Sequence, residues 1–435
     1  MSIHSSFKNK TAESRKKKEL LIILLSGTII FSSIFVYTYI INHPYELSDF
    51  PTINIVIDGD IEKGEYTDCT VEVDIKDHSE EVQVLNGRIK IRGHTNANEN
   101  IPKKEYRIEL NKRKSLLGMR IDDDWLLLAM YYDFPRMRIK MSFDLWRSLS
   151  DTNPTANLPD SKYVGLYING ELQGLYLLAE EFDRRLLGFG EPQNNEDSSL
   201  IFQLRVTNNL TSYYKTQWDQ DWPNEEEGYF IIDSILPELI EFISSTNDDE
   251  FFDSENGIYS KFNKQNLIDF LIYNFFINHK DFWDTNYYIV RNSNPSKFYL
   301  VPWDFDGSFG QRGWVIFNSN ENCEPTILLT NHLYRRLLNN ENFRRDVRDR
   351  WNFLRDVLWT EEFMMDLLSD IYNDVKSLIE LDTRKWKPLT VENEDLVYNR
   401  YLYSTKEFDL EEYIDELFQF IPKRLEFCDS YFNSL

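Results

Sequence analysis

Cysteine, glycine and proline are scarce in this chain of 435 residues, which contains 3, 16 and 14 of them respectively. The cysteines, Cys69, Cys323 and Cys428, are far apart and match no zinc-binding spacing. Because their number is odd and small, a disulfide framework is excluded and at most one bridge can form. The scarcity of glycine and proline, together with the absence of an internal repeat, excludes a linker-rich or repetitive protein.

Positive charge is also in short supply. The chain has 48 Lys and Arg against 73 Asp and Glu, which gives a formal net charge of −25. A surface this acidic repels phosphate backbones, so we expect no nucleic-acid partner. Two interpretations stay open: the acidity suits a basic protein substrate or a site for divalent cations, or it only keeps the protein soluble.

A long apolar segment lies near the N-terminus. Residues 20–41 are 22 positions without a charged side chain, and as a helix they span roughly 33 Å, enough to cross a bilayer. The short apolar region and small-residue cleavage site of a secretory signal are not present, so we expect an uncleaved, single-pass transmembrane anchor. Six basic residues lie in the tail 1–19, and the next one after the span is Lys63. This asymmetry predicts a cytoplasmic N-terminus and an extracytoplasmic main domain at the cell membrane.

Two different patterns follow the short linker 42–50. Residues 51–182 alternate apolar and polar side chains in stretches such as INIVID and EYRIEL, and a hairpin is expected to turn at Asn169-Gly170. Residues 183–435 contain long segments with helical apolar spacing, while the acidic stretch WDQDWPNEEEG is expected to be an exposed loop. The sequence therefore predicts an α+β fold with a β-rich N-lobe at 51–182, a helical C-lobe at 183–435 and a cleft between them.

A group of acids and one amide surrounds a predicted hairpin in the C-lobe. A helix leads into HKDFWDTN, which contains Asp281 and Asn286, and the strand returning from the hairpin ends in DFDG, which contains Asp304 and Asp306. This order places Asp281, Asn286 and Asp304 at one end of one hairpin, where they can converge. Each motif alone is better explained by a capped turn or a solvated loop, whereas the two motifs together, in this order around a hairpin, favour a site.

Phosphoryl transfer requires such a set of groups. Mg²⁺ that bridges phosphate oxygens prefers carboxylate and amide ligands, which fits Asn286 and Asp304, with Asp306 as a further ligand. A separate carboxylate must orient the acceptor hydroxyl and accept its proton, which fits Asp281, with Asp284 as the weaker alternative. The spacing thus predicts a phosphotransfer site.

Four motifs, GRIKIRGHTN, PKKEYRIEL, YVGLYINGELQGLYLLAEEFD and VPWDFDGSFG, occur in an order that resembles the CotH family of atypical spore-coat protein kinases. The resemblance covers residues 51–310 and is looser beyond. It implies a divergent protein-kinase-like bilobal fold that uses ATP, with Mg²⁺ or Mn²⁺, to phosphorylate Ser or Thr of protein substrates. It also implies that Asp281 is the catalytic aspartate, Asp304 a metal-binding aspartate and Asn286 the asparagine of the catalytic loop.

The resemblance places nucleotide contacts in the N-lobe as well. The basic pair of the family falls on Lys103 and Lys104, and strand parity puts Lys104 on the apolar face of its strand, so Lys104 is expected to contact the phosphates. Arg92 and Gly93 are expected beside the phosphates, because a glycine admits close backbone approach. Glu180 ends a strand where such a fold passes to its hinge, which predicts a position near the adenine.

Three functions stay open from the sequence. The main prediction is a membrane-anchored kinase that acts on basic, Ser-rich proteins. A second possibility is a surface adhesion or interaction protein that keeps the fold without catalysis. The presence of Asp281, Asn286 and Asp304 together argues against it, because a binding protein does not need all three. A nucleotidyl transferase would use the same cleft and the same groups.

Overall fold

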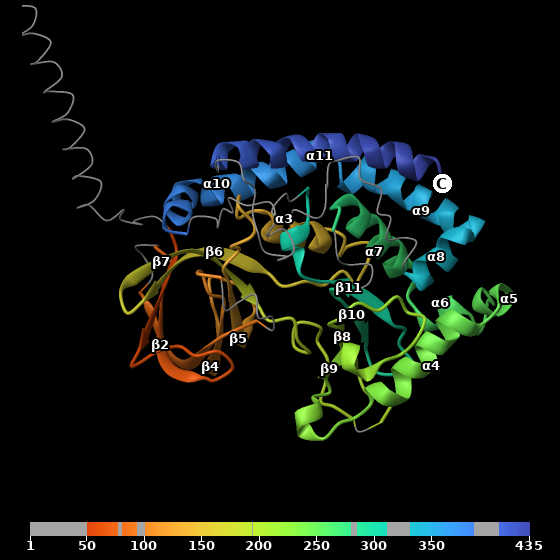
Figure 1. Ribbon diagram of the computed structural model, residues 1–435, viewed down its shortest axis with the longest axis horizontal. Helices are drawn as coiled ribbons and strands as arrows, with labels where there is room; N and C mark the ends of the chain where they lie inside the picture. The colour runs from red at the N-terminus through yellow and green to blue at the C-terminus, as the bar shows by residue number, and fades with distance from the viewer. Residues whose placement is uncertain are drawn as a thin grey trace, which may run out of the picture. The chain divides into compact units, whose positions relative to one another are not determined.

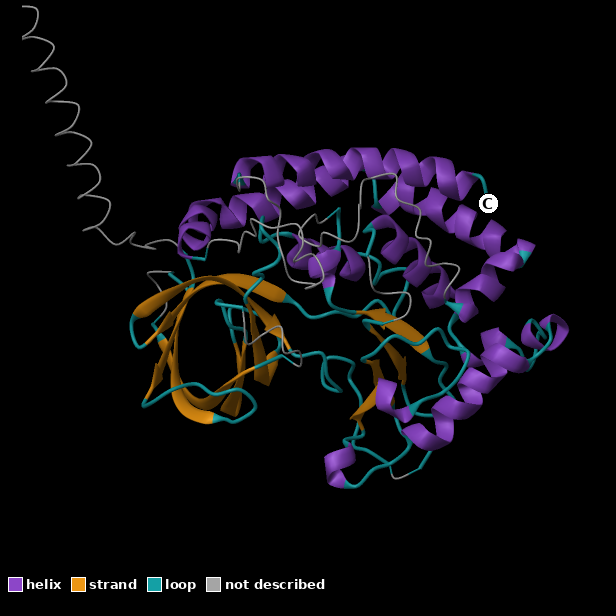
Figure 2. Ribbon diagram, in the orientation of Figure 1, coloured by secondary structure: helices purple, strands orange, loops and turns teal. Residues whose placement is uncertain are grey.

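The computed structural model describes residues 50–76, 81–93, 101–193, 195–279, 285–310, 331–386 and 409–435. Residues 51–435 form one compact unit. Within it, a β-barrel lies beside a smaller sheet, and helices pack along both (Figures 1 and 2). No helix in these described ranges is long and apolar enough to cross a membrane.

The first part of the unit is a closed barrel in the order β1-β2-β3-β4-β5-β7-β6. Neighbouring strands are antiparallel except β1 and β6, which run parallel and close the barrel, with Thr52 opposite Gly165. The strands are β1 (Thr52–Ile57), β2 (Thr67–Asp74), β3 (Gln83–Ile91), β4 (Tyr106–Ser115), β5 (Ile121–Leu128), β6 (Ser161–Ile168) and β7 (Glu171–Glu180).

Alternating side chains fill this barrel. Ile53, Ile55, Val71, Ile89 and Trp125 are fully buried in one apolar cluster, and the residues between them on each strand face outward. The predicted hairpin is confirmed: β6 and β7 turn at Asn169 and Gly170, which both have positive φ, at 50° and 80°. These angles are those of a type I′ turn, whose twist matches that of the two strands.

A four-stranded sheet in the order β11-β10-β8-β9 follows the barrel. Its strands are β8 (Leu200–Leu204), β9 (Trp218–Trp222), β10 (Tyr287–Arg291) and β11 (Tyr299–Pro302). β10 and β11 form the hairpin expected behind HKDFWDTN, in antiparallel register from Tyr287 opposite Pro302. The stretch WDQDW, which we expected in a loop, is strand β9, because its two tryptophans and Gln220 are buried while the aspartates between them are not.

Helices supply the rest of the fold. Asn263, Asn331, Asn340, Thr360 and Asp409 each accept a backbone N–H at the start of α7, α8, α9, α10 and α11, which satisfies donors that the first turn leaves free. Within the described ranges the two longest helices, α10 and α11, pack against each other; α10 also contacts the barrel strands β6 and β7, and α11 contacts α7 (Figure 1). The α-helices are α3 (Arg138–Arg147), α4 (Ile232–Ser245), α5 (Asp248–Phe251), α6 (Ile258–Lys261), α7 (Lys264–Phe276), α8 (His332–Asn339), α9 (Glu341–Phe353), α10 (Glu361–Lys385) and α11 (Leu410–Asn433). Short 3₁₀ turns are η1 (Lys215–Gln217), η2 (Glu225–Glu227) and η3 (Phe305–Gly307), and η5 (Leu354–Leu358) is a π-helical turn.

The predicted fold class, a protein-kinase-like pair of lobes behind a transmembrane helix, is wrong for this structure. The strands of the expected N-lobe close into a barrel, and the expected helical lobe contains a four-stranded sheet. Alternation of apolar residues reports one buried face in an open sheet and in a barrel alike, so it did not reveal the β1–β6 closure. The described helices include none that could span a membrane, and the predicted span 20–41 lies outside the described residues.

Candidate functional site

A cleft of about 1110 Å³ lies between the outer face of the barrel and the four-stranded sheet. Side chains of β3, β4 and β5 line it from the barrel, and side chains of β8, β9 and β10 line it from the sheet. The segment Glu181–Arg185, which leaves the barrel after β7, runs along it. The predicted lobe boundary at residues 182 and 183 falls in this segment. The volume is sufficient for a cofactor-sized ligand.

Four cations line the cleft from the barrel: Lys63, Lys90, Arg92 and Arg107. Lys90 and Arg107 lie directly opposite each other on β3 and β4. Arg107 pairs with Asp124 at 3.0 Å and with Glu181 at 3.7 Å. A wall with several cations attracts a phosphate-bearing ligand.

Acidic groups face this wall from the sheet and from the connecting segment. Asp219 is paired with Arg205, whereas the Asp221 side chain is open to the cleft. Desolvation of the carboxylate within the cleft and the nearby Glu181 raise the pKa of Asp221 to about 7, although Arg205 and Arg107 oppose that shift. Burial also raises the pKa of Glu181, although Arg107 and Arg92 oppose that shift. The cleft therefore holds two carboxylates that bind protons more readily than usual.

Asn286 and Asp304 lie at the same end of the β10–β11 hairpin, as the sequence predicted. Asn286 directly precedes β10, its carbonyl accepts the Trp303 N–H at 3.0 Å, and Asp304 comes next in the chain. Both residues have left-handed backbones, with φ of 57° and 65°. Asp306 belongs to the following turn, η3. One amide and two carboxylates within a few residues of one hairpin end have the donor chemistry that Mg²⁺ prefers, so these side chains fit the predicted ion.

The cleft and this hairpin end adjoin. Trp303, the residue before Asp304, lines the cleft, as does Tyr288 of β10. Burial raises the pKa of the Tyr288 hydroxyl, and Asp221, Glu181 and Asp304 raise it further while Arg92 lowers it. The pKa of this one buried hydroxyl therefore depends on charges from both cleft walls and from the hairpin end.

The chain is anchored just before the loop that carries the predicted catalytic group. Asp281, like Asp284, lies outside the described residues. His279, just before it, is buried, and its Nε2 lies 3.1 Å from the Trp303 carbonyl. Arg424 of α11, fully buried, donates to the carbonyls of Phe275 and Phe276 at the end of α7. These contacts fix the point from which the loop departs.

The two neighbouring lysines are placed differently from the parity argument. β4 begins only at Tyr106, so Lys104 precedes the strand; it is half-buried, does not line the cleft, and its carbonyl accepts the Tyr176 hydroxyl at 2.8 Å. Lys103 is the buried lysine: its Nζ lies 2.8 Å from Asp382 of α10, and neither side chain is exposed. A phosphate role for Lys104 stays a prediction, and the structure does not bring it to the cleft wall.

The other nucleotide contacts expected on the barrel fall into two groups. Arg92 and Gly93 line the cleft, and Arg92 donates to Glu105 at 3.3 Å. Glu180 is buried outside the cleft lining and accepts the backbone N–H groups of Arg120 and Asp160, at 3.0 Å each. Its neighbour Glu181 faces the cleft instead.

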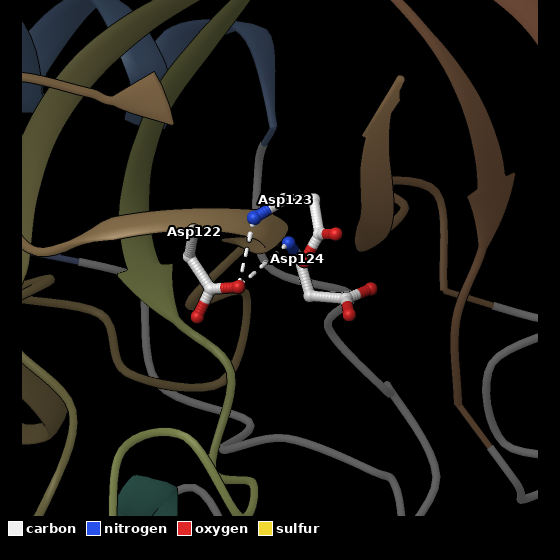
Figure 3. A group of neighbouring side chains, drawn as sticks. All are labelled: Asp122, Asp123 and Asp124. Carbon is white, nitrogen blue, oxygen red and sulfur yellow. Dashed lines mark hydrogen bonds between the residues drawn. The ribbon is translucent and has the colours of Figure 1, made fainter. Parts of the chain in front are cut away.

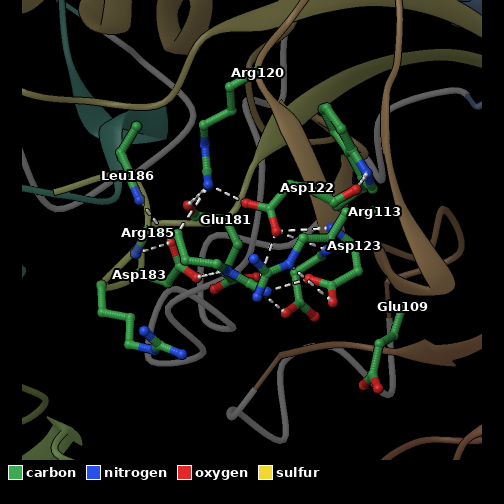
Figure 4. A network of polar contacts seen from close by, with 12 residues as sticks. Glu109, Arg113, Arg120, Asp122, Asp123, Glu181, Asp183, Arg185 and Leu186 are labelled. Atoms are coloured by element: carbon green, nitrogen blue, oxygen red, sulfur yellow. Dashed lines mark hydrogen bonds and ion pairs between the residues drawn. The ribbon is translucent and has the colours of Figure 1, made fainter. Parts of the chain in front are cut away.

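A second acidic group, Asp122, Asp123 and Asp124 at the start of β5, brings three carboxylates within 4.8 Å of one another (Figure 3). Arg185 pairs with all three, and Arg120 pairs with Asp122 (Figure 4). The arginines neutralise this group, which therefore ties the segment after β7 to the barrel.

Sequence reasoning missed Lys90, Arg107 and Asp221. Lys90 and Arg107 occupy the polar positions of the strands GRIKIRG and EYRIEL, so parity alone placed them outside the barrel, but it did not show that the sheet would cover that face. Asp221 was hidden because its segment was expected to be a loop.

The chain is similar in sequence to proteins that are already known. Residues 89–428 match the family model described as CotH kinase protein. The inner spore coat protein H of Bacillus subtilis (strain 168) is 24% identical over 294 residues, which cover 65% of this chain and 75% of that protein. The crystal structure of a Helicobacter pylori proinflammatory kinase, CtkA, aligns over 75% of this chain and 94% of its own, with 10% identity and a TM-score of 0.27, too low to establish a shared fold. The resemblance drawn from the four motifs is confirmed, and the chain belongs to the CotH kinase protein family.

Proposed function

We propose that this chain is a kinase that transfers the γ-phosphate of ATP to Ser or Thr of protein substrates. Its family supports the kinase class. The observation that carries the proposal is that Trp303 and Arg92 line one cleft while Asp304 directly follows Trp303. A cationic wall for phosphates and the candidate ion ligands therefore adjoin.

In this proposal each group of residues has a separate role. Arg92 and the other cations of the barrel wall bind the phosphates, and Asn286, Asp304 and Asp306 hold a divalent ion. When bound, Mg²⁺ or Mn²⁺ neutralises the negative charge of the phosphates. Asp281 orients the acceptor hydroxyl and accepts its proton.

The acceptor proposed is a basic, Ser-rich protein. The net charge of −25 repels acidic partners and attracts basic ones. The relative from Bacillus subtilis is named as an inner spore coat protein. Proteins of a spore coat are therefore the first substrates to test.

The test is intact-mass spectrometry of the chain and of a basic, Ser-containing protein after incubation with ATP and either Mg²⁺ or Mn²⁺. We expect a mass increase of one or more phosphates. Asp281→Asn should lower the rate by at least ~10²-fold, the low end of the contribution of a positioned general base. Asp304→Asn should abolish the transfer that depends on the divalent ion.

Asp284→Asn is the matched control, because it removes a neighbouring carboxylate of the same loop. Adducts of a whole nucleotide instead of phosphate would assign a nucleotidyl transferase. If the folded wild type modifies nothing with either ion, the noncatalytic adhesion function replaces the kinase.

A further inference from the structure

Lys90 is a cation in the cleft wall that forms no ion pair with a carboxylate of the described part of the chain, although Glu109 and Glu181 lie near enough to act on its charge. Its Nζ lies 4.3 Å from the centre of the Tyr66 ring, which Arg88 also contacts. Arg88 is paired with Glu109 at 2.8 Å and Arg107 with Asp124 at 3.0 Å, so both neighbours already have acidic partners. Burial and the adjacent Arg107 lower the pKa of Lys90, and Glu109 and Glu181 only partly oppose that shift.

The placement of Lys90 opposite Arg107 is unfavourable for the protein alone. Like charges directly across two strands repel each other. An anion bound between the β3 and β4 side chains relieves that repulsion and supplies the counter-charge of Lys90. This part of the wall is therefore built for an anion from outside the chain.

Asp221 is the corresponding group on the opposite wall. Ile201 pairs with Trp222 and Phe202 pairs with Gln220, so Asp221 is the extra residue of a β-bulge. Bulges re-aim a side chain and occur beside active sites. The carboxylate opens into the cleft, and within the described ranges it makes no hydrogen bond or ion pair.

We infer that Lys90 and Asp221 bind opposite ends of one nucleoside triphosphate and so fix its direction in the cleft. Lys90 binds the phosphates against the barrel wall. Asp221 accepts hydrogen bonds from hydroxyl or amino groups of the nucleoside at the sheet wall. The inference rests on the proposed function for the identity of the ligand, and it assigns roles to two residues for which the sequence predicted none.

Three probes separate the two ends in calorimetric titrations of the full chain: ATP, inorganic tripolyphosphate and adenosine. Lys90→Met should weaken ATP and tripolyphosphate by about 10-fold, the scale of one charged hydrogen bond, and leave adenosine unchanged. Lys90→Arg should restore both. Asp221→Asn should weaken ATP and adenosine by about 3- to 10-fold and leave tripolyphosphate unchanged or slightly tighter.

Lys112→Met and Asp68→Asn are matched controls, since both change one exposed charge on a barrel strand away from the cleft. Melting temperatures of all variants show that they are folded. Tripolyphosphate binding that survives Lys90→Met, adenosine binding that survives Asp221→Asn, or a wild type that binds none of the probes would overturn the inference.

The two proposals fail in different ways. Phosphate transfer by the wild type, with probe binding insensitive to both substitutions, would leave the kinase standing and remove this inference. Probe binding that follows Lys90 and Asp221 in a protein that transfers no phosphate would do the reverse.

Discussion

A single carboxylate, Asp221, links the pH of the solution to the stability of the fold. Its pKa is raised from a usual value of 3.8 to about 7, so the folded chain binds this proton more tightly than the unfolded chain does. Between those two values the folded state holds the extra proton, and the free energy of unfolding therefore falls as the pH rises. The contribution is present in full at low pH and is lost as the pH rises toward the folded-state pKa.

We therefore predict that Asp221→Asn, which cannot ionise, stabilises the protein in a pH-dependent manner. Its melting temperature should approach that of the wild type only at about pH 4 and below, and should exceed it by an amount that grows up to about pH 8. Melting curves over this range check the prediction, with Asp68→Asn, an aspartate outside the cleft, as the control. A difference between Asp221→Asn and wild type that does not vary with pH would contradict it.

The lysine pair shows what a sequence can and cannot establish about single residues. The motif locates a basic pair, but the parity argument requires that the strand include Lys104. The strand begins at Tyr106, so Lys103 is the lysine that turns inward, toward Asp382 more than 270 positions along the chain. A partner that distant leaves no local pattern, whereas Asn286 and Asp304 were placed correctly because one hairpin joins them.

At the scale of elements, a buried charge cluster holds α10 against the barrel. The Asp382 carboxylate accepts a hydrogen bond from the Arg136 side chain at 2.8 Å and another from the Leu175 N–H at 2.9 Å. It also forms an ion pair with Lys103 at 2.8 Å. Although burial opposes its charge, Lys103 and Arg136 lower the pKa of Asp382 below its usual range. Gly174 allows this approach, because a Cβ there would lie 2.2 Å from the carboxylate.

Asp382→Asn should destabilise the protein by about 3 kcal/mol, because it leaves two buried cations without a counter-charge. Urea denaturation measures the change. Asp370→Asn, an exposed aspartate on the same helix, is the control and should shift stability by less than ~0.5 kcal/mol. Equal stabilities for Asp382→Asn and wild type would show that the cluster does not hold α10.

The barrel strands, the β10–β11 hairpin, the long helices and the β6–β7 turn were predictable because each depends on nearby residues, whereas β8 and β9 were not predicted. The pairing of β1 with β6 and the addition of β8 and β9 to the hairpin were not, because they join segments far apart in the chain. The cleft itself arises from those long-range pairings. Its lining could therefore not be predicted, although several of its residues stood in recognised motifs.

For the whole molecule, the acidic balance predicts how the proposed kinase selects acceptors. The catalytic efficiency, kcat/KM, should be higher for a basic Ser-containing peptide than for an acidic one of equal length. The preference should fall as salt rises from about 0.01 to 1 M, since screening shortens the reach of surface charge from about 30 to 3 Å. Initial rates for both peptides across that series provide the measurement. An unchanged ratio at all salt concentrations would show that net charge does not select the acceptor.

The parallel pair that closes the barrel also has a kinetic consequence. Thr52 and Gly165 lie roughly a hundred positions apart, so the two ends of a long segment must meet before β1 can pair with β6. The antiparallel neighbours from β1 to β5 join shorter stretches and can assemble first. During synthesis the first strand of the barrel therefore keeps an open edge until β6 has left the ribosome, and only then does the barrel lose its exposed hydrogen-bonding groups.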